Sequence, residues 1–129
     1  MGRKGNARLV ERAFLFVSQA GEQRTDNLQA FLQTTYGHAS APRLADMTQT
    51  LLYSGLFKRV GWYDRVDNTM LRSSKTSKEL GLHSARYICV VDAKTKDEII
   101  DKYLEGKSTL RRLESMPAFV RQMVKEAKQ

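Results

Sequence analysis

The chain has 129 residues, the length of one domain or of one domain with a small appendage. About 41% of the residues are hydrophobic and 28% are charged, so a chain of this length can bury a core without disulfides or metals. No run of roughly 18 apolar residues occurs, which argues against a transmembrane helix. The single cysteine, Cys89, excludes an internal disulfide and a multi-cysteine zinc site, and we expect a cytoplasmic or nucleoid-associated protein.

The chain is strongly basic, with 22 Lys and Arg against 14 Asp and Glu and a formal net charge of +8. An excess of this size on a small protein favours a polyanionic partner, of which nucleic acid is the commonest. The competing interpretation is that the positive charge only keeps the protein soluble. The cations are spread along the chain, and the densest stretch lies between residues 58 and 86.

Two amphipathic helices are predicted in the first part of the chain. Apolar residues recur at helical spacing from Asn6 to Ala20, with Asn6 as the N-cap and Gly21 as the stop. The second helix is expected to begin at Thr25, whose hydroxyl suits an N-cap, and to end at Gly37.

A third helix is predicted from Ser40 to Gly55, with Pro42 in the first turn, where a missing N–H costs nothing. Its buried stripe consists of Leu44, Met47, Leu51 and Leu52. The outward face then consists of Arg43, Asp46, Gln49, Thr50 and Tyr53.

Two strands are predicted next, at residues 57–63 and 86–92, separated by a polar stretch at 64–85 that is expected to be a loop. Thr95 and Glu98 have the spacing of a capping box, which indicates the start of a helical tail. The apolar stripe of that tail predicts either a dimer surface or packing against the chain's own first helix. The candidate dimer residues are Leu110, Leu113, Phe119, Val120 and Met123.

The four residues from Gly37 to Ser40 have the length of the turn in a helix-turn-helix. Residues 51–61 then read as the end of a helix, a glycine turn and a first strand. With these features, residues 6–92 resemble the winged-helix DNA-binding superfamily. The resemblance implies an α+β, mostly helical fold, with a flexible basic N-terminus at residues 1–5 and a C-terminal helical extension at 93–129. The chain departs from the family in its wing loop, which spans about 22 residues and is long for a structureless connection.

The resemblance implies that the third helix enters the major groove of DNA. Arg43 then donates two hydrogen bonds to guanine and Gln49 pairs with adenine, and Thr50 and Tyr53 are further base-reading candidates. Contacts to the DNA backbone are implied for His38, Ser40, Lys58, Arg59, Arg65, Arg72, Lys75, Lys78 and Arg86. A monomer of this kind grips few base pairs, so a homodimer is expected.

Residues 75–88 carry a competing signal, because they are similar to the helix-turn-helix of partition-type DNA-binding proteins. In that arrangement His83, Ser84 and Arg86 read the groove. Residues 87–91 are apolar for five positions running, whereas a recognition helix needs an exposed polar face. This favours the strand, and both arrangements imply nucleic-acid binding.

The sequence therefore predicts sequence-specific or semi-specific binding of double-stranded DNA, by a transcriptional regulator or a replication or partition accessory factor. The alternatives are a winged-helix adaptor module that binds other proteins, and an RNA-binding factor. No glycine-rich phosphate loop, HExxH or GxSxG motif occurs in the sequence, so we expect neither an enzyme nor a bound cofactor or metal.

Overall fold

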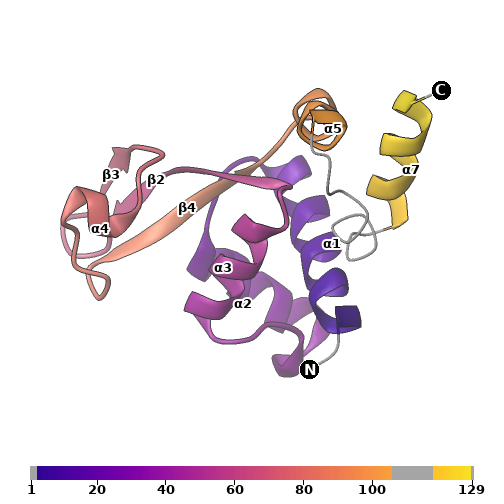
Figure 1. Cartoon of the computed structure of the whole chain (residues 1–129). Helices are drawn as coiled ribbons and strands as arrows, with labels where there is room; N and C mark the ends of the chain where they lie inside the picture. The colour runs from indigo at the N-terminus through magenta and orange to yellow at the C-terminus, as the bar shows by residue number, and fades with distance from the viewer. Residues whose placement is uncertain (1–2, 106–117, 129) are drawn as a thin grey trace.

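The computed structural model describes residues 3–105 and 118–128 of the chain. Within these ranges the fold is α+β, with a four-stranded antiparallel sheet in the order β1-β4-β2-β3. In Figure 1, α1, α2 and α3 lie together on one side of the long strands β2 and β4, and β3 and α4 lie at the far end of those strands. The elements in chain order are α1 (Arg3–Ala20), β1 (Gln23–Arg24), α2 (Thr25–Tyr36), the 3-10 turn η1 (His38–Ser40), α3 (Leu44–Tyr53), β2 (Phe57–Asp64), β3 (Thr69–Arg72), α4 (Ser77–Leu80), β4 (Tyr87–Ala93), α5 (Lys96–Glu105) and α7 (Ala118–Lys128). None of the described helices is long and apolar enough to cross a membrane.

The first two helices occupy the predicted segments, but their starts differ from the prediction. Helix α1 begins at Arg3, so Asn6 lies inside the helix and most of the predicted flexible segment 1–5 is helical. Helix α2 begins with Thr25, which is only 1% exposed and donates its Oγ1 hydrogen to the carbonyl oxygen of Cys89 at 3.2 Å. Thr25 is therefore not the predicted N-cap. Its hydroxyl joins the helix to the sheet, because Arg24 just before it pairs with Val90 in strand β1.

The third helix begins later than predicted, at Leu44 instead of Ser40. The physical reason is Pro42, since the residue before a proline is driven out of the helical region. Ala41 is accordingly extended, with φ −136° and ψ 124°, and this ends η1 before α3 can start. The predicted end of the helix is confirmed, because Gly55 follows with φ 82°, a left-handed conformation that favours glycine.

The two predicted strands are confirmed as β2 and β4, but the stretch between them is not the predicted loop. β2 turns back through residues 65–68 into β3, and the short helix α4 precedes β4. The competing helix-turn-helix at 75–88 is wrong, because β4 begins at Tyr87 where a recognition helix was required. We call residues 61–87, which project beyond the helices, the arm (Figure 1).

Two features of β2 shape the arm. Gly61 is required where β3 crosses, because a Cβ atom there would lie 2.5 Å from the carbonyl oxygen of Leu71. A bulge lies one residue earlier, at Val60, since Arg59 pairs with Val91 whereas Gly61 pairs with Val90. The extra residue changes which side chains share a face of the sheet.

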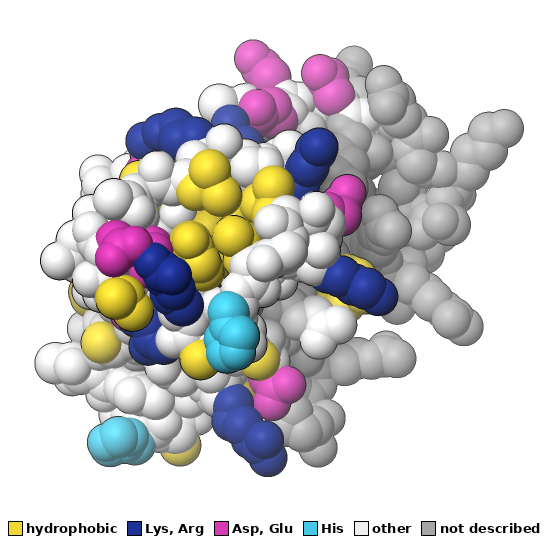
Figure 2. Space-filling view, turned by 90° about the vertical axis from the view of Figure 1, so that its left-hand side faces the viewer, with side chains coloured by type: hydrophobic (Ala, Val, Ile, Leu, Met, Phe, Trp, Pro, Cys, Tyr) yellow, Lys and Arg dark blue, Asp and Glu magenta, His cyan; other side chains and the backbone are white. Residues whose placement is uncertain are grey.

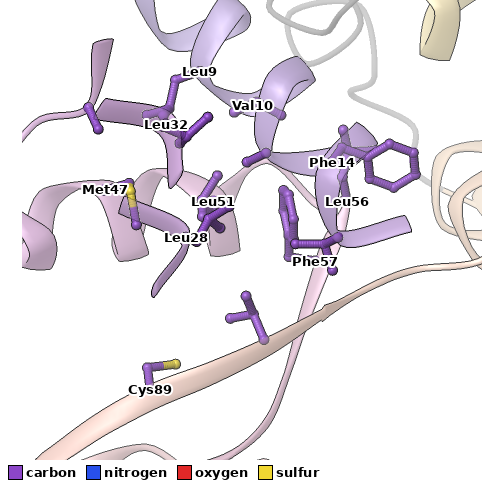
Figure 3. Packing of buried hydrophobic residues seen from close by; sticks show 14 of the residues in the cluster. Leu9, Val10, Phe14, Leu28, Leu32, Met47, Leu51, Leu56, Phe57 and Cys89 are labelled. Carbon is purple, nitrogen blue, oxygen red and sulfur yellow. The ribbon is translucent and has the colours of Figure 1, made fainter. Parts of the chain in front are cut away.

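The core lies between the three N-terminal helices and the sheet (Figure 3). Its largest fully buried side chains include Leu28, Leu32, Met47, Leu51 and Leu56. Each contributes about 2 kcal/mol of hydrophobic stabilisation, so this cluster is the main source of the fold's stability.

The C-terminal helices join the same core. The predicted capping box is confirmed, with the backbone N–H of Thr95 donating to Glu98 Oε2 at 2.7 Å and that of Glu98 donating to Thr95 Oγ1 at 3.2 Å. Val120 is fully buried in the core and Met123 is half-buried against it, so these two residues pack within the chain, which favours the alternative interpretation of this stripe over a dimer surface. Leu110, Leu113 and the side chain of Phe119 lie outside the described residues.

Candidate nucleic-acid interface

The outward face of α3 is polar and solvent-exposed. Arg43, Asp46, Gln49 and Tyr53 follow one another at helical spacing and are all exposed; we call them the α3 face. Tyr53 is 78% exposed, which is unusual for an aromatic side chain. The opposite side of the helix is anchored in the core, so these side chains are presented from a rigid element. Thr50, the remaining predicted base-reading residue, is half-buried.

The side chains of the α3 face lack partners within the described part of the chain. Arg43, Gln49 and Tyr53 make no side-chain hydrogen bond or ion pair with any residue that the structure describes. A guanidinium, a carboxamide and a phenol that remain unpaired at the surface retain their full hydrogen-bonding capacity for an external ligand.

The turn before α3 contributes less than predicted. His38 is exposed, but the hydroxyl of Ser40 is already engaged, because it donates to the carbonyl oxygen of Leu32 at 2.8 Å. The same hydroxyl lies 2.5 Å from the carbonyl oxygen of Gly37. Its role is to hold the turn that positions α3.

At the tip of the arm, where β2 ends and β4 begins, Arg86 is held by carboxylates. Its Nε donates to Asp64 Oδ2 at 2.9 Å, and its Nη2 donates to Asp67. Asp64 is only 2% exposed, and its other oxygen accepts the backbone N–H groups of Val66 at 2.9 Å and Asp67 at 3.2 Å. Burial acts to raise the pKa of Asp64, but the hydrogen bonds from Arg86 and from these N–H groups outweigh it and lower the pKa from 3.8 to about 2.

Two further predicted DNA-backbone cations are also paired within the chain. Arg72 forms a two-pronged ion pair with Glu22, at 2.9 and 3.2 Å, and this pairing raises the pKa of Arg72. Lys58 pairs with Glu98 at 3.3 Å, which places it next to α5 at the opposite end of β2 from the arm. The structure therefore does not bring all the predicted cations to one surface.

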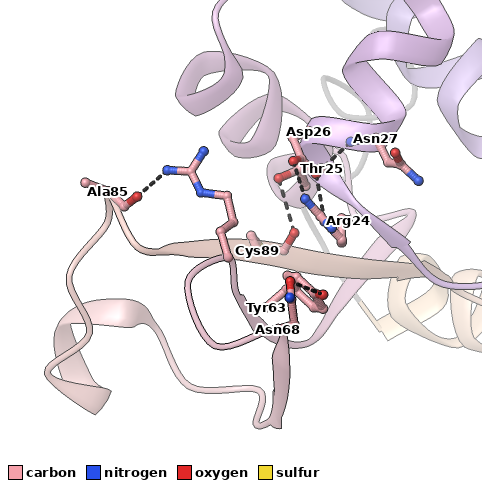
Figure 4. A network of polar contacts seen from close by, with 9 residues as sticks. Arg24, Thr25, Asp26, Asn27, Tyr63, Asn68, Ala85 and Cys89 are labelled. Carbon is pink, nitrogen blue, oxygen red and sulfur yellow. Dashed lines mark hydrogen bonds and ion pairs between the residues drawn. The ribbon is translucent and has the colours of Figure 1, made fainter.

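Arg59 and Arg65 face the space between α3 and the arm. The guanidinium of Arg59 lies over the Trp62 ring, 5.1 Å from its centroid, and Arg65 donates to the carbonyl oxygen of Ala85. Figure 4 shows the hydrogen bond to the carbonyl oxygen of Ala85, together with the Thr25–Cys89 hydrogen bond that joins α2 to β4. Trp62 is 8% exposed and donates its Nε1 hydrogen to the carbonyl oxygen of Lys75 at 3.0 Å, so it packs within the arm.

Helix α4 and the residue before its N-cap present the exposed lysines of the arm. Lys75 and Lys78 are exposed, and Lys78 has no ion-pair partner among the described residues. The helix is closed by a capping box between Thr76 and Glu79, in which each residue's side chain accepts the other's backbone N–H. That Thr-x-x-Glu spacing was visible in the sequence and could have revealed α4.

A groove of about 690 Å³ separates α3 from the arm. Leu44, Leu52 and Tyr53 border it on the helix side, and Trp62 and Ile88 border it on the sheet side. Figure 2 views the molecule from the arm side and shows hydrophobic side chains at the centre of that face, bordered by Lys and Arg. No pattern in the sequence predicted this groove, because its walls come from segments distant in the chain.

The described residues contain no group of three or more His, Cys, Asp or Glu placed to hold a metal ion. Comparison of the chain with protein-family models, with curated proteins and with solved structures finds no match. The chain's function is therefore inferred from its own geometry and charge.

Proposed function

We propose that the chain is a winged-helix protein that binds double-stranded DNA in a sequence-specific or semi-specific manner, as a transcriptional regulator or a replication or partition factor. The observation that carries the proposal is the α3 face: Arg43 at the N-cap of α3 and Gln49 and Tyr53 within the helix are exposed, and they have no hydrogen-bond or ion-pair partner among the described residues. A major groove accommodates one α-helix, and these side chains have the hydrogen-bonding capacity to read bases there.

The order of elements supports the same reading. Two helices joined by a short turn, α2 and α3, are followed directly by a β-hairpin, and this is the order of a helix-turn-helix with a wing. The arm then stands where the wing would be. The net charge of +8 supplies the long-range attraction to a polyanion.

In this arrangement the residues divide into two roles. Arg43 donates two hydrogen bonds to guanine, Gln49 pairs with adenine, and Asp46 accepts from cytosine or orients Arg43. Lys78 on α4 and Lys75 just before that helix contact phosphates, because they are the exposed lysines of the arm. Arg72 and Arg86 position the arm through their ion pairs.

Fluorescence anisotropy of the full chain with labelled random duplex DNA, single-stranded DNA and duplex RNA, across a salt titration, tests the proposal. We expect duplex DNA to bind best and its affinity to fall steeply with salt. The variant Arg43→Ala/Gln49→Ala should weaken duplex binding, whereas Arg8→Ala/Gln19→Ala should not. This control removes the same side-chain types from exposed positions of α1.

Three other outcomes of these binding measurements would overturn the proposal. Equal weakening by both double variants would show that net charge, not the α3 face, causes binding. Preference for duplex RNA would favour the RNA-binding alternative. Absence of binding to every nucleic acid at low salt would favour the adaptor alternative, for which the strong exposure of Tyr53 and Val66 is the relevant observation.

A further inference from the structure

The groove between α3 and the arm has the dimensions of a small-molecule site. Its volume of about 690 Å³ lies within the range of about 300–1,000 Å³ that such sites occupy. Its walls are largely apolar, with Leu44, Leu52, Trp62 and Ile88 contributing hydrocarbon or ring surface. An apolar concavity of this size on the face proposed to bind DNA is not needed for contact with phosphates.

The charge of the groove is one-sided. Arg59 and Arg65 both line it, and none of the described residues that line it is Asp or Glu. Arg65 is engaged with the carbonyl oxygen of Ala85. The carboxylate that interacts electrostatically with Arg59 is that of Glu79, and it is already engaged in the capping box with Thr76. Arg59 is therefore the group best able to receive a further anion.

Arg59 faces the groove because of the bulge at Val60. In a regular strand, Arg59 and Trp62 are three residues apart and would lie on opposite faces of the sheet. The extra residue brings both side chains to the groove face, and Arg59 lies over the Trp62 ring. Arg59 is also beside Cys89: burial raises the pKa of the Cys89 thiol, and a side-chain hydrogen bond with Arg59 and the positive charge of Arg59 act against that increase.

One atom in this arrangement lacks a partner. The Nε of Arg59 is buried and makes no hydrogen bond with any residue that the structure describes. Buried N–H groups are almost always paired, and leaving the donor of a charged group unpaired is destabilising. A bound anion can draw the guanidinium into an arrangement that satisfies this donor.

We propose that the groove binds a small organic anion with an apolar body, such as an aryl or alkyl carboxylate, whose carboxylate pairs with Arg59 while its body packs against Trp62 and Leu52. Gln49 and Tyr53 line the same groove and belong to the α3 face. A ligand that engages them competes with DNA. This regulatory consequence rests on the proposed DNA-binding function, whereas the ligand site itself does not.

The ligand site is tested on the full chain with 4-phenylbutyrate and its neutral analogue 4-phenylbutyramide. Trp62 is the only tryptophan in the sequence and lines the groove, so its fluorescence reports binding directly. We expect a saturable change with 4-phenylbutyrate and binding of the amide that is weaker by about tenfold or more. Arg59→Met should abolish this preference. Arg8→Met, which removes an exposed cation of α1 outside the groove, should leave it unchanged.

A second variant tests the location independently of charge. Ala45 is exposed on α3 and lines the groove, so Ala45→Phe should fill the site without disturbing the core, as circular dichroism can verify. We expect this variant to lose binding of 4-phenylbutyrate. The site is overturned by equal affinity for acid and amide, by no saturable signal up to about 10 mM acid, or by unchanged binding in Ala45→Phe.

The proposed competition between ligand and DNA is measured separately, by anisotropy with duplex DNA. At a concentration ten times its own Kd, 4-phenylbutyrate should weaken DNA binding about tenfold in the wild type and far less in Arg59→Met. Ligand binding without any DNA binding would overturn the proposed function and leave the ligand site standing. Simultaneous binding of ligand and DNA without coupling would overturn the regulation alone.

Discussion

The α3 face and the arm both contain arginines, but the arginines are placed in different chemical situations. Arg43 at the N-cap of α3 is exposed and has no ion-pair partner among the residues at 3–105 and 118–128, whereas Arg72 and Arg86 on the arm are bound by Glu22 and by Asp64 with Asp67. A cation that is already paired must give up its carboxylate before it can contact a phosphate. The number of cations in a segment is therefore a poor guide to its binding capacity, and their partners decide it.

The comparison also separates two kinds of structural support. α3 is held by hydrophobic burial against the core, while the tip of the arm is held mainly by hydrogen bonds and ion pairs. Changes in the arm's polar network should therefore affect stability, and changes on the α3 face should affect binding.

The largest expected effect is that of Asp64→Ala. This change removes one buried carboxylate and leaves the Nε of Arg86 and the backbone N–H groups of Val66 and Asp67 without their acceptor, while Arg86 Nη2 keeps Asp67. We expect a clear decrease in Tm, measured by circular dichroism, and faster amide exchange in the arm. The control is Asp46→Ala, which removes a carboxylate from the α3 face and should leave Tm unchanged. Equal Tm values for the two variants would contradict the view that the polar network of the arm stabilises the fold and the α3 face does not.

Acid should weaken the arm for the same reason. The pKa of Asp64 is lowered from 3.8 to about 2 in the folded chain, so its ionised form stabilises the fold fully above pH 4. That contribution should be lost progressively as the pH falls from about 4 towards 2. A plot of Tm against pH should be steeper in this range for the wild type than for Asp64→Asn, and parallel curves would refute the role assigned to this carboxylate.

Next in size is the effect of Arg43 variants on DNA selectivity. Arg43→Ala should cost about 1–3 kcal/mol of discrimination between a selected site and random duplex, because the two-pronged contact with guanine is lost. Arg43→Lys keeps the charge but not the planar fork, so it should retain general affinity and lose selectivity. Competition binding with both DNAs measures the difference. Full selectivity in Arg43→Lys would mean that Arg43 contacts only phosphate.

The smallest effect is expected from single lysines of the arm. Lys78→Ala should reduce the slope of log affinity against log salt by about one unit, because one phosphate contact is lost. Arg72→Ala removes a cation that is paired with Glu22, so its slope should change by much less. A larger change in this slope for Arg72→Ala than for Lys78→Ala would contradict the view that a cation already paired within the chain contributes less to phosphate binding.

Much of the fold could be predicted from local patterns. The helical spacing of apolar residues located α1, α2 and α3, and the β-branched run located β4. These signals were sufficient because burying one face of a helix or strand imposes a period on the sequence. The start of α3 was misplaced, since the constraint that Pro42 exerts on Ala41 outweighed the preference of proline for a first helical turn.

The parts that could not be predicted depend on residues far apart in the chain. β1 has two residues and exists because β4 pairs with it, and the Arg72–Glu22 ion pair joins positions 50 residues apart. Composition alone determined that the chain is basic, and the helical spacing of apolar residues determined that the outward side of α3 is polar. Only the tertiary structure decided which cations are neutralised, that Val120 is buried, and that Arg59 faces a groove, because these outcomes require folding to bring distant segments into contact.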